Sequence, residues 1–347
     1  MIIKKILTIR KSGYRIKINN TKQCLIIINT KTGGIIMRTR EKPINKWKYI
    51  RKELYKNRFL YLMLLLPLAY FFVFKYGAIG WLGIAFKRFN ARAGLWGSPW
   101  VGFKYFKMFL EDPYFFTVLK NTLVISLWSL CFYFPVPIIL ALLINEVKKP
   151  GRKKAVQTIT YLPYFISTVV VCNLAMYIFA TDGIVNDIIV KIFGGEAKTF
   201  LSDPNWFRPI YIITEIWQNA GWGSIIYLAA LSGVDQQLYE AAAIDGASRW
   251  KQVIHISLPG ISSIISIQLL LTLGRMLNVG YEKILLLYNG STYSTADIIS
   301  TYVYRRGLID ANYSYGAAIS VFQAIVSLIL ICCANKAADK IGATSLW

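Results

Sequence analysis

Charged side chains are scarce in this sequence: they make up 16% of its 347 residues, whereas 55% are hydrophobic and 15% are aromatic. A water-soluble domain of this length needs far more charge to cover its surface, so a lipid bilayer is the natural solvent for most of the chain. The composition therefore predicts an integral membrane protein.

Histidine is nearly absent too, and the few cysteines lack the spacing of a metal-binding or redox motif. The sequence has one histidine, His255, and its five cysteines form no CxxC motif. Four of these cysteines fall within apolar stretches, where a thiol behaves as a small hydrophobic side chain. The sequence accordingly predicts neither a metal site nor a disulfide framework.

The motifs of catalysis are absent as well. There is no GxxxxGK[ST] loop that could hold the phosphates of ATP, so an ATP-driven process would need its motor on another chain. We find no Ser/His/Asp set, no paired carboxylate with an accessible base and no cluster of metal ligands. We expect no catalytic residue, no cofactor bound by this chain and no enzymatic activity.

Positive charge, by contrast, is in excess, with 40 Lys and Arg against 17 Asp and Glu and a formal net charge of +23. Much of the excess precedes residue 58, and a further basic block occupies residues 148–154 between two apolar stretches. Basic blocks beside apolar spans follow the positive-inside rule. A nucleic-acid surface would spread basic and aromatic side chains over one folded face. We therefore expect no nucleic-acid partner.

Six apolar segments approach the length of about 20 residues that crosses the hydrocarbon core. They run approximately over residues 59–83, 118–144, 159–180, 210–231, 260–281 and 315–334. The predicted fold class is therefore an all-α integral membrane protein with six transmembrane helices.

The charges of the connecting loops predict the orientation of these spans. The basic N-terminal segment, the 148–154 loop, the loop with Arg249 and Lys251 and the C-terminal tail would be cytoplasmic. The acidic loop 181–209 would lie outside. The basic loop 87–107 departs from the rule on the outer side, but the N-terminal block outweighs it. Both termini are expected in the cytoplasm.

The sequence also divides into two parts. Residues 1–58 form a basic cytoplasmic segment, and residues 59–347 form the membrane domain. Residues 1–36 show no periodicity and only short apolar patches. We expect this leader to be disordered, or the natural start to be Met37.

A short loop between the fourth and fifth predicted spans has a distinct pattern. Residues 239–260 read YEAAAIDGASRWKQVIHISLPG. Glu-Ala-Ala-Ala favours a helix, Asp245-Gly246 favours a turn, and Pro259 begins the next span. Trp250, Val253, Ile254 and Ser257 have the spacing of one helical face, which suits docking into a groove of another protein.

This loop resembles the EAA loop of ABC importer permeases, whose pattern is EAAxxDGA followed later by Leu-Pro. The matching residues are Glu240, Ala241, Ala242, Asp245, Gly246, Ala247, Leu258 and Pro259. Segments 59–87, 97–123 and 295–316 and the terminal TSLW resemble the maltose-type carbohydrate-uptake permeases, in particular their LplB-like branch for oligosaccharides and polysaccharides. The resemblance covers nearly everything after about residue 49.

The resemblance implies a bacterial cytoplasmic-membrane permease that imports oligosaccharides. Such a chain would pair with a second homologous permease, two ATP-binding subunits that hold ATP and Mg, and an extracytoplasmic sugar-binding protein. The eight matching loop residues would couple ATP hydrolysis to transport. Membrane lipid would surround the spans.

Polar side chains within the spans indicate where a substrate would pass, because such side chains are costly in lipid. Two helical faces carry them: Glu215, Gln218, Asn219 and Trp222 in the fourth span, and Gln268, Thr272, Arg275 and Glu282 in the fifth. Amide and carboxylate groups can bind sugar hydroxyls, and Trp222 could stack on a sugar ring. The same residues could instead join helices to one another.

Arg275 and Glu282 would lie two turns apart on one continuous helix, about 10 Å along its axis. That separation is too large for an intimate pair, so Arg275 would be free to meet a sugar hydroxyl or a uronate carboxylate. An ion-coupled secondary transporter of a polar solute is the alternative function. It would usually show an inverted repeat, which we do not find, and it leaves the 239–260 loop unexplained.

Overall fold

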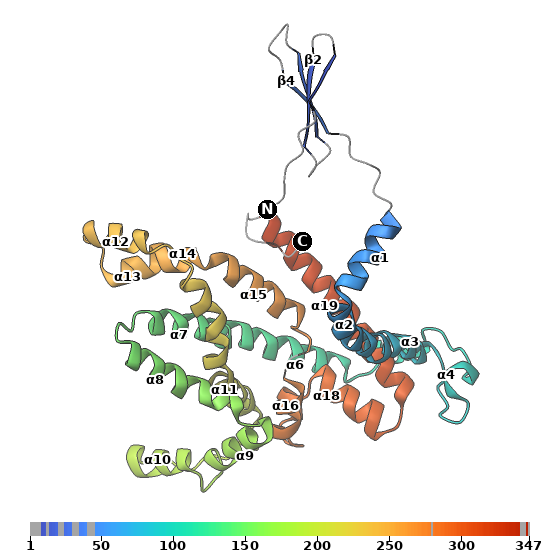
Figure 1. Ribbon diagram of the computed structural model, residues 1–347. Coiled ribbons are helices and arrows are strands. Elements are labelled where there is room, and N and C mark those ends of the chain that lie inside the picture. The colour runs from blue at the N-terminus through green and yellow to red at the C-terminus, as the bar shows by residue number, and fades with distance from the viewer. Residues whose placement is uncertain are drawn as a thin grey trace. The chain divides into compact units, whose positions relative to one another are not determined.

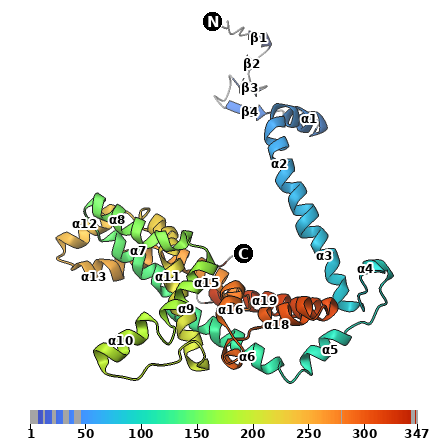
Figure 2. The same ribbon diagram turned by 90° about the horizontal axis from the view of Figure 1, so that it is seen from below.

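The computed structural model describes residues 8–11, 14–19, 24–29, 35–39, 46–278, 280–340 and 345. The chain divides into two compact units, Met1–Ala78 and Ile79–Trp347. Figures 1 and 2 show the elements of both units.

The N-terminal unit begins with four strands, β1 (Thr8–Lys11), β2 (Tyr14–Asn19), β3 (Cys24–Asn29) and β4 (Ile35–Thr39). They form an antiparallel sheet in the order β1-β2-β3-β4. In its register, Thr8 faces Lys17 and Tyr14 faces Asn29. The all-α fold class therefore does not hold for the residues of these four strands. The disorder of residues 1–36, or a natural start at Met37, stays a prediction.

The sequence contains signals for these strands that the search for spans passes over. Residues 14–18 alternate apolar and basic side chains with the period of two that a strand requires, and residues 26–28 are three consecutive isoleucines. β-branched side chains favour extended backbone. These patterns are short, and a window of about 20 residues averages them away.

The helices of this unit follow the sheet along the chain. They are α1 (Lys46–Lys56), α2 (Arg58–Tyr70) and the π-helical η1 (Phe71–Tyr76). α3 (Gly77–Trp81) crosses the boundary between the units and leads into the 3₁₀ helix η2 (Leu82–Phe86). Together Arg58–Phe86 are long and apolar enough to cross a membrane.

The described part of the second unit is helical apart from one bridge between Lys87 and Trp100. Its elements are α4 (Gly94–Gly97), α5 (Lys104–Leu110), α6 (Phe115–Trp128), η3 (Ser129–Tyr133), α7 (Pro135–Asn145), α8 (Pro150–Tyr161), η4 (Leu162–Phe165), α9 (Thr168–Ile178), α10 (Ile184–Phe193), α11 (Pro204–Leu231), α12 (Gln236–Ile244), α13 (Arg249–Gln252), η5 (Val253–Ser257), α14 (Leu258–Gly260), α15 (Ser262–Gly274), α16 (Tyr281–Leu287), α17 (Tyr293–Ala296), α18 (Ile299–Val303), η6 (Tyr304–Ile309) and α19 (Tyr313–Lys340).

Three helical stretches among the described residues are long and apolar enough to span a membrane: Arg58–Phe86, Phe115–Asn145 and Tyr313–Lys340. Two bent helix pairs raise this number to five if each counts as one span. α11 is a continuous helix of 28 residues, about 42 Å long at 1.5 Å per residue, but it carries Glu215, Gln218 and Asn219. The count of six remains a prediction.

Two predicted spans are broken in the structure. The third bends by 96° between Pro150–Phe165 and Thr168–Ile178. Pro163 lies in η4 just before this bend, where its missing N–H disfavours a continuous helix. The fifth begins beyond a bend of 61° at Ile261 and stops at Gly274, so the prediction that it reaches residue 281 is wrong.

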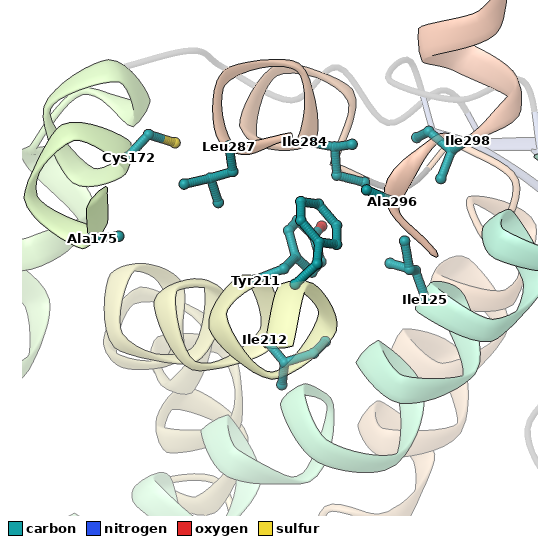
Figure 3. Packing of buried hydrophobic residues seen from close by; sticks show 10 residues of the cluster. Ile125, Cys172, Ala175, Tyr211, Ile212, Ile284, Leu287, Ala296 and Ile298 are labelled. Atoms are coloured by element: carbon teal, nitrogen blue, oxygen red, sulfur yellow. The ribbon is translucent and has the colours of Figure 1, made fainter. Parts of the chain in front are cut away.

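Among the described residues of the second unit, the buried apolar side chains form three clusters. One of them joins α6, α9, α11 and α16 around Tyr211. Figure 3 shows Tyr211 of α11 lying between its own helix and Ile284 and Leu287 of α16. Another cluster packs α7 against the C-terminal half of α11, where Ile138 and Tyr227 are both buried. α11 is therefore the central element that positions the polar residues described below.

We predict that deleting residues 1–40, which include all four strands, leaves membrane insertion intact. Residues 42–58 still supply the basic block that directs insertion. The measurement is the amount of membrane-inserted chain in cells that express the truncated chain, compared with the full chain. A truncated chain that no longer inserts would show that residues 1–40 contribute to insertion.

Candidate substrate path and coupling segment

The polar face of α11 is a connected group. Glu215, Asn219 and Trp222 follow one another at helical spacing, and Asn219 Nδ2 donates to Glu215 Oε1 at 2.9 Å. Gln218 lies apart from them: it is buried, and its Nε2 donates to the carbonyl oxygen of Ile166 at 3.1 Å. Ile166 lies in the bend between η4 and α9, where the backbone hydrogen bonds of the helix are interrupted. Gln218 therefore satisfies a backbone carbonyl that the broken third span leaves without a helical partner.

Glu215 has a second partner that the sequence analysis missed. Lys283 Nζ on α16 donates to Glu215 Oε2 at 2.6 Å, and the Lys283 side chain is only 4% exposed. The neighbouring Glu282, which is predicted for the substrate path, is exposed in the structure. The sequence contains one signal for this pair. Lys283 is a lone lysine beside a predicted membrane span, and a cation buried there needs a partner of opposite charge.

The predicted shared face of Arg275 and Glu282 is absent because α15 ends early. Arg275 caps α15, and α16 starts only at Tyr281, so Arg275 and Glu282 do not share one helical face. Three contacts hold the described residues of the connecting segment. Ser126 donates to the carbonyl of Met276, Gln323 donates to the carbonyl of Leu277, and Gln323 Nε2 donates to Asn278 Oδ1 at 2.9 Å.

Gly280 ends this segment in a conformation that few other residues could adopt. Its φ is +47°, in the left-handed region that favours glycine. The hydroxyl of Tyr211 occupies the place that a Cβ at this position would take. The close approach of Tyr211 therefore ties the start of α16 to α11.

Two cavities adjoin these helices. The larger has a volume of about 530 Å³ and is lined by Tyr133, Phe134, Pro137, Trp222, Gly223, Ile225, Ile226, Tyr227, Gln268 and Thr272. The smaller has a volume of about 270 Å³ and is lined by Ser126, Ser129, Leu130, Tyr133, Tyr211, Glu215, Thr272, Leu273, Arg275, Met276, Asn278 and Gly280. Because both share Tyr133 and Thr272, they are neighbours. We call them the aromatic cavity and the arginine cavity.

Five of the eight residues predicted for the substrate path line these cavities. Trp222 and Gln268 line the aromatic cavity, Glu215 and Arg275 line the arginine cavity, and Thr272 lines both. Gln218, Asn219 and Glu282 do not line either cavity. Contact with a substrate stays a prediction for all eight.

Trp222 is fixed by neighbouring rings. It stacks on Tyr164 with ring centroids 4.5 Å apart and an interplanar angle of 4°, and it meets Phe165 edge-on. Its side chain is still 42% exposed. A rigid, half-exposed indole offers an apolar surface at little entropic cost. Its placement on the wall of the aromatic cavity suits stacking against a flat, partly apolar ligand.

The segment that resembles the EAA loop forms a helix, a turn and a second helical stretch between α11 and α15. Asp235 caps α12 by accepting from the N–H of Gln237 at 2.9 Å. Gly246 has φ +74°, which confirms the predicted turn. Gln252 Nε2 donates to the carbonyl of Ala247 at 3.2 Å, and the hydroxyls of Tyr239 and Ser257 lie 2.8 Å apart. These contacts brace the two helical arms.

Several side chains on this segment are unusually exposed for their type. Ile244 is 86% exposed and Trp250 is 72% exposed, and the nearby Glu240 and Asp245 are exposed too. The predicted face of the second arm is only partly present. Ile254 is exposed as Trp250 is, but Ser257 is buried, because the π-helical η5 changes the phase of the turn.

The described residues contain no group of three or more His, Cys, Asp and Glu side chains that could hold a metal ion. The chemistry offered by the two cavities is hydrogen bonding, ring stacking and the charge of Arg275.

Comparison with known proteins assigns the class. Residues 119–339 match the family described as "binding-protein-dependent transport system inner membrane component", and the chain belongs to this family. This segment contains α11, the lining of both cavities and the α12–α13 turn. The chain is thus a multi-pass component of an inner-membrane transport system.

Individual relatives narrow the class to ABC permeases. The chain is 46% identical to "Polygalacturonan/rhamnogalacturonan transport system permease protein YteP" of Bacillus subtilis (strain 168) over 303 residues, covering 87% of this chain and 94% of that relative. It is 44% identical to "Protein LplB" of the same organism, covering 84% of this chain and 92% of that one. These matches confirm the resemblance to the LplB-like branch.

A solved structure agrees with the fold. The chain is similar to a chain in the crystal structure of a bacterial ABC transporter involved in the import of the acidic polysaccharide alginate, with a TM-score of 0.77 and 43% identity. The match covers 84% of this chain and 99% of that chain. A second match, at 42% identity and the same TM-score, is to a chain of a bacterial alginate ABC transporter in complex with an alginate pentasaccharide-bound periplasmic protein.

Proposed function

We propose that this chain is the permease subunit of an ATP-driven importer that moves oligosaccharides across the cytoplasmic membrane. The observation that carries the proposal is the 46% identity to a permease named for the transport of polygalacturonan and rhamnogalacturonan, over 87% of this chain. The aromatic cavity supports it independently, since ring faces and amides are the groups that bind sugars.

In this proposal the chain pairs with a second homologous permease, and an extracytoplasmic binding protein delivers the substrate. The similarity to a transporter crystallised with a substrate-bound periplasmic protein supports the latter partner. Two separate ATP-binding subunits supply the energy, because no phosphate-binding loop occurs in this sequence.

The α12–α13 turn couples these subunits to the path. It lies at one end of the second unit, together with the α7–α8 loop, while α16 and α18 lie away from it (Figures 1 and 2). Arg249 Nη1 contacts Glu146 Oε2 at 3.4 Å across that end. The basic 148–154 loop supports a cytoplasmic location for this end, with both termini inside. Exposed Ile244 and Trp250 then face an ATPase groove.

The test is uptake by proteoliposomes that contain this permease, its partner permease, the ATPase subunits and the binding protein. We expect labelled oligogalacturonate to accumulate only with internal ATP and the binding protein. Uptake that needs no ATP and collapses with an ionophore would instead support ion-coupled transport.

We predict that Trp222→Ala weakens oligosaccharide binding by the assembled transporter roughly threefold to tenfold, the range expected when one stacking ring is lost. Trp222→Phe should retain most of the affinity. Trp217→Ala is the matched control, because Trp217 lies on the same helix with 45% exposure and lines neither cavity. Equal losses in Trp222→Ala and Trp217→Ala would contradict a role of Trp222 in stacking.

A further inference from the structure

We propose that the arginine cavity is a subsite for a carboxylate of the transported sugar, with Arg275 as its specificity-determining residue. The permease itself would then distinguish uronate-bearing from neutral oligosaccharides. This inference rests on the proposed function and deepens it.

Arg275 differs from Arg208 and Arg305, two other arginines of the second unit, in having no side-chain partner among the described residues. No side-chain hydrogen bond or ion pair joins Arg275 to any described residue, and the side chain is exposed. Arg208 donates to Asn121 Oδ1 at 3.0 Å, and Arg305 pairs with the buried Asp297 at 2.5 Å. A guanidinium at membrane depth is costly when nothing neutralises it. Arg275 therefore carries an unpaired positive charge, with which an anionic group of a ligand can form an ion pair.

The acidic residue of the same cavity does not compete for this charge. Glu215 is bound on both oxygens: Lys283 Nζ donates to Oε2 at 2.6 Å, and Asn219 Nδ2 donates to Oε1 at 2.9 Å. The Glu215 and Lys283 charges cancel locally. With Glu215 neutralised by Lys283, Arg275 is the remaining charged side chain among the described residues that line the arginine cavity, so the net charge of this cavity is positive.

The subsite is also held in shape. Arg275 begins the segment that Ser126 on α6 and Gln323 on α19 fasten through the carbonyls of Met276 and Leu277. Ser129 Oγ, in the wall of the same cavity, is buried and has no hydrogen-bond partner among the described residues. A fixed backbone reduces the entropy lost when a ligand binds. This unpaired hydroxyl belongs to the wall of the arginine cavity.

The chemistry matches a sugar acid. A guanidinium binds a carboxylate through two parallel N–H···O bonds, which are stronger than bonds to neutral hydroxyls. Through Tyr133 and Thr272 the arginine cavity adjoins the aromatic cavity, where Trp222 offers a surface for a sugar ring. One chain of linked sugars can therefore place a ring in one cavity and a carboxylate in the next.

The experiment measures equilibrium binding to the complete transporter in nanodiscs, with two probes of equal length and linkage. Tetragalacturonate carries carboxylates, and its fully methyl-esterified form carries none. In Arg275→Gln we expect the Kd for tetragalacturonate to rise about tenfold or more, the loss typical of a charge-assisted bond. The Kd for the methyl ester should change less than about twofold. Arg275→Lys should lie between wild type and Arg275→Gln.

A matched control is Arg88→Gln, which removes an exposed arginine that lines neither cavity and should leave both Kd values unchanged. Equal losses for the two probes in Arg275→Gln, or no loss for either, overturn the subsite. So does a wild-type complex that binds both probes equally well. If the wild-type complex binds neither probe but imports a neutral oligosaccharide with ATP, the subsite fails and the proposed function stands. If it imports with ATP only a solute that is not an oligosaccharide, both fail.

Discussion

Replacing Gly246 with valine should abolish most of the ATP hydrolysis that the substrate-loaded binding protein stimulates, lowering it at least tenfold. Gly246 has φ +74° at the turn between α12 and α13. A left-handed backbone costs an L-residue about 1–2 kcal/mol, and a β-branched side chain adds further strain. The turn would relax by moving the two arms, and the exposed Ile244 and Trp250 would no longer match an ATPase groove.

The control separates backbone strain from crowding. A Cβ at Gly246 would meet nothing within 4 Å, so added volume by itself should be harmless. Gly246→Asn, which tolerates the left-handed region, should keep most of the stimulation. The measurement is ATP hydrolysis in proteoliposomes with and without loaded binding protein. Wild-type stimulation in Gly246→Val would remove this turn from the coupling mechanism, and an equal loss in both variants would show that strain is not the cause.

The turn at Gly246 could be predicted because its cause is local. Asp-Gly after a run of good helix formers leaves glycine as the residue that takes a positive φ. The polar face of α11 was equally accessible to sequence reasoning, since one period of 3.6 places Glu215, Asn219 and Trp222 together. Both features depend on neighbours fewer than ten residues away.

The end of α15 could not be predicted in the same way. Met276, Leu277 and Val279 are apolar, and a window of about 20 residues averages out the polar residues between them, so it extends the span to residue 281. What stabilises the break lies elsewhere in the chain: Ser126 on α6 and Gln323 on α19 satisfy carbonyls that a continuous helix would have satisfied itself. The error in this helix end placed Arg275 and Glu282 on one helical face, whereas the structure has them on separate elements, and it left Lys283 unnoticed.

The predicted role of Gln218 shows a different limit. Its side chain type and spacing are those of a substrate-binding residue, yet it is buried and bonded to the carbonyl of Ile166. A polar residue in a span serves either a ligand or a bent backbone. The choice depends on where a neighbouring helix bends, which is a tertiary property.

Lys283→Met should lower the free energy of unfolding of the transporter by about 3 kcal/mol, because it leaves Glu215 without its charge partner inside the bundle. Lys283 is 4% exposed and Glu215 is 22% exposed, so solvent can relieve little of the unpaired charge. The double variant Glu215→Gln/Lys283→Met removes both charges and should recover most of the loss, since burying a pair has its own desolvation cost.

The contrast with an exposed pair makes this test specific. Lys191 and Asp187 lie 3.0 Å apart on α10 with side-chain exposures of 71% and 57%. Lys191→Met should therefore lower the free energy of unfolding by less than about 1 kcal/mol.

Unfolding is followed by titration with a denaturing detergent, and the four-membered cycle of Glu215 and Lys283 variants isolates their interaction. Additive losses in that cycle would mean that the two residues stabilise the bundle separately. In that case Glu215 would be an uncompensated anion beside Arg275, and that cavity would have no excess of positive charge.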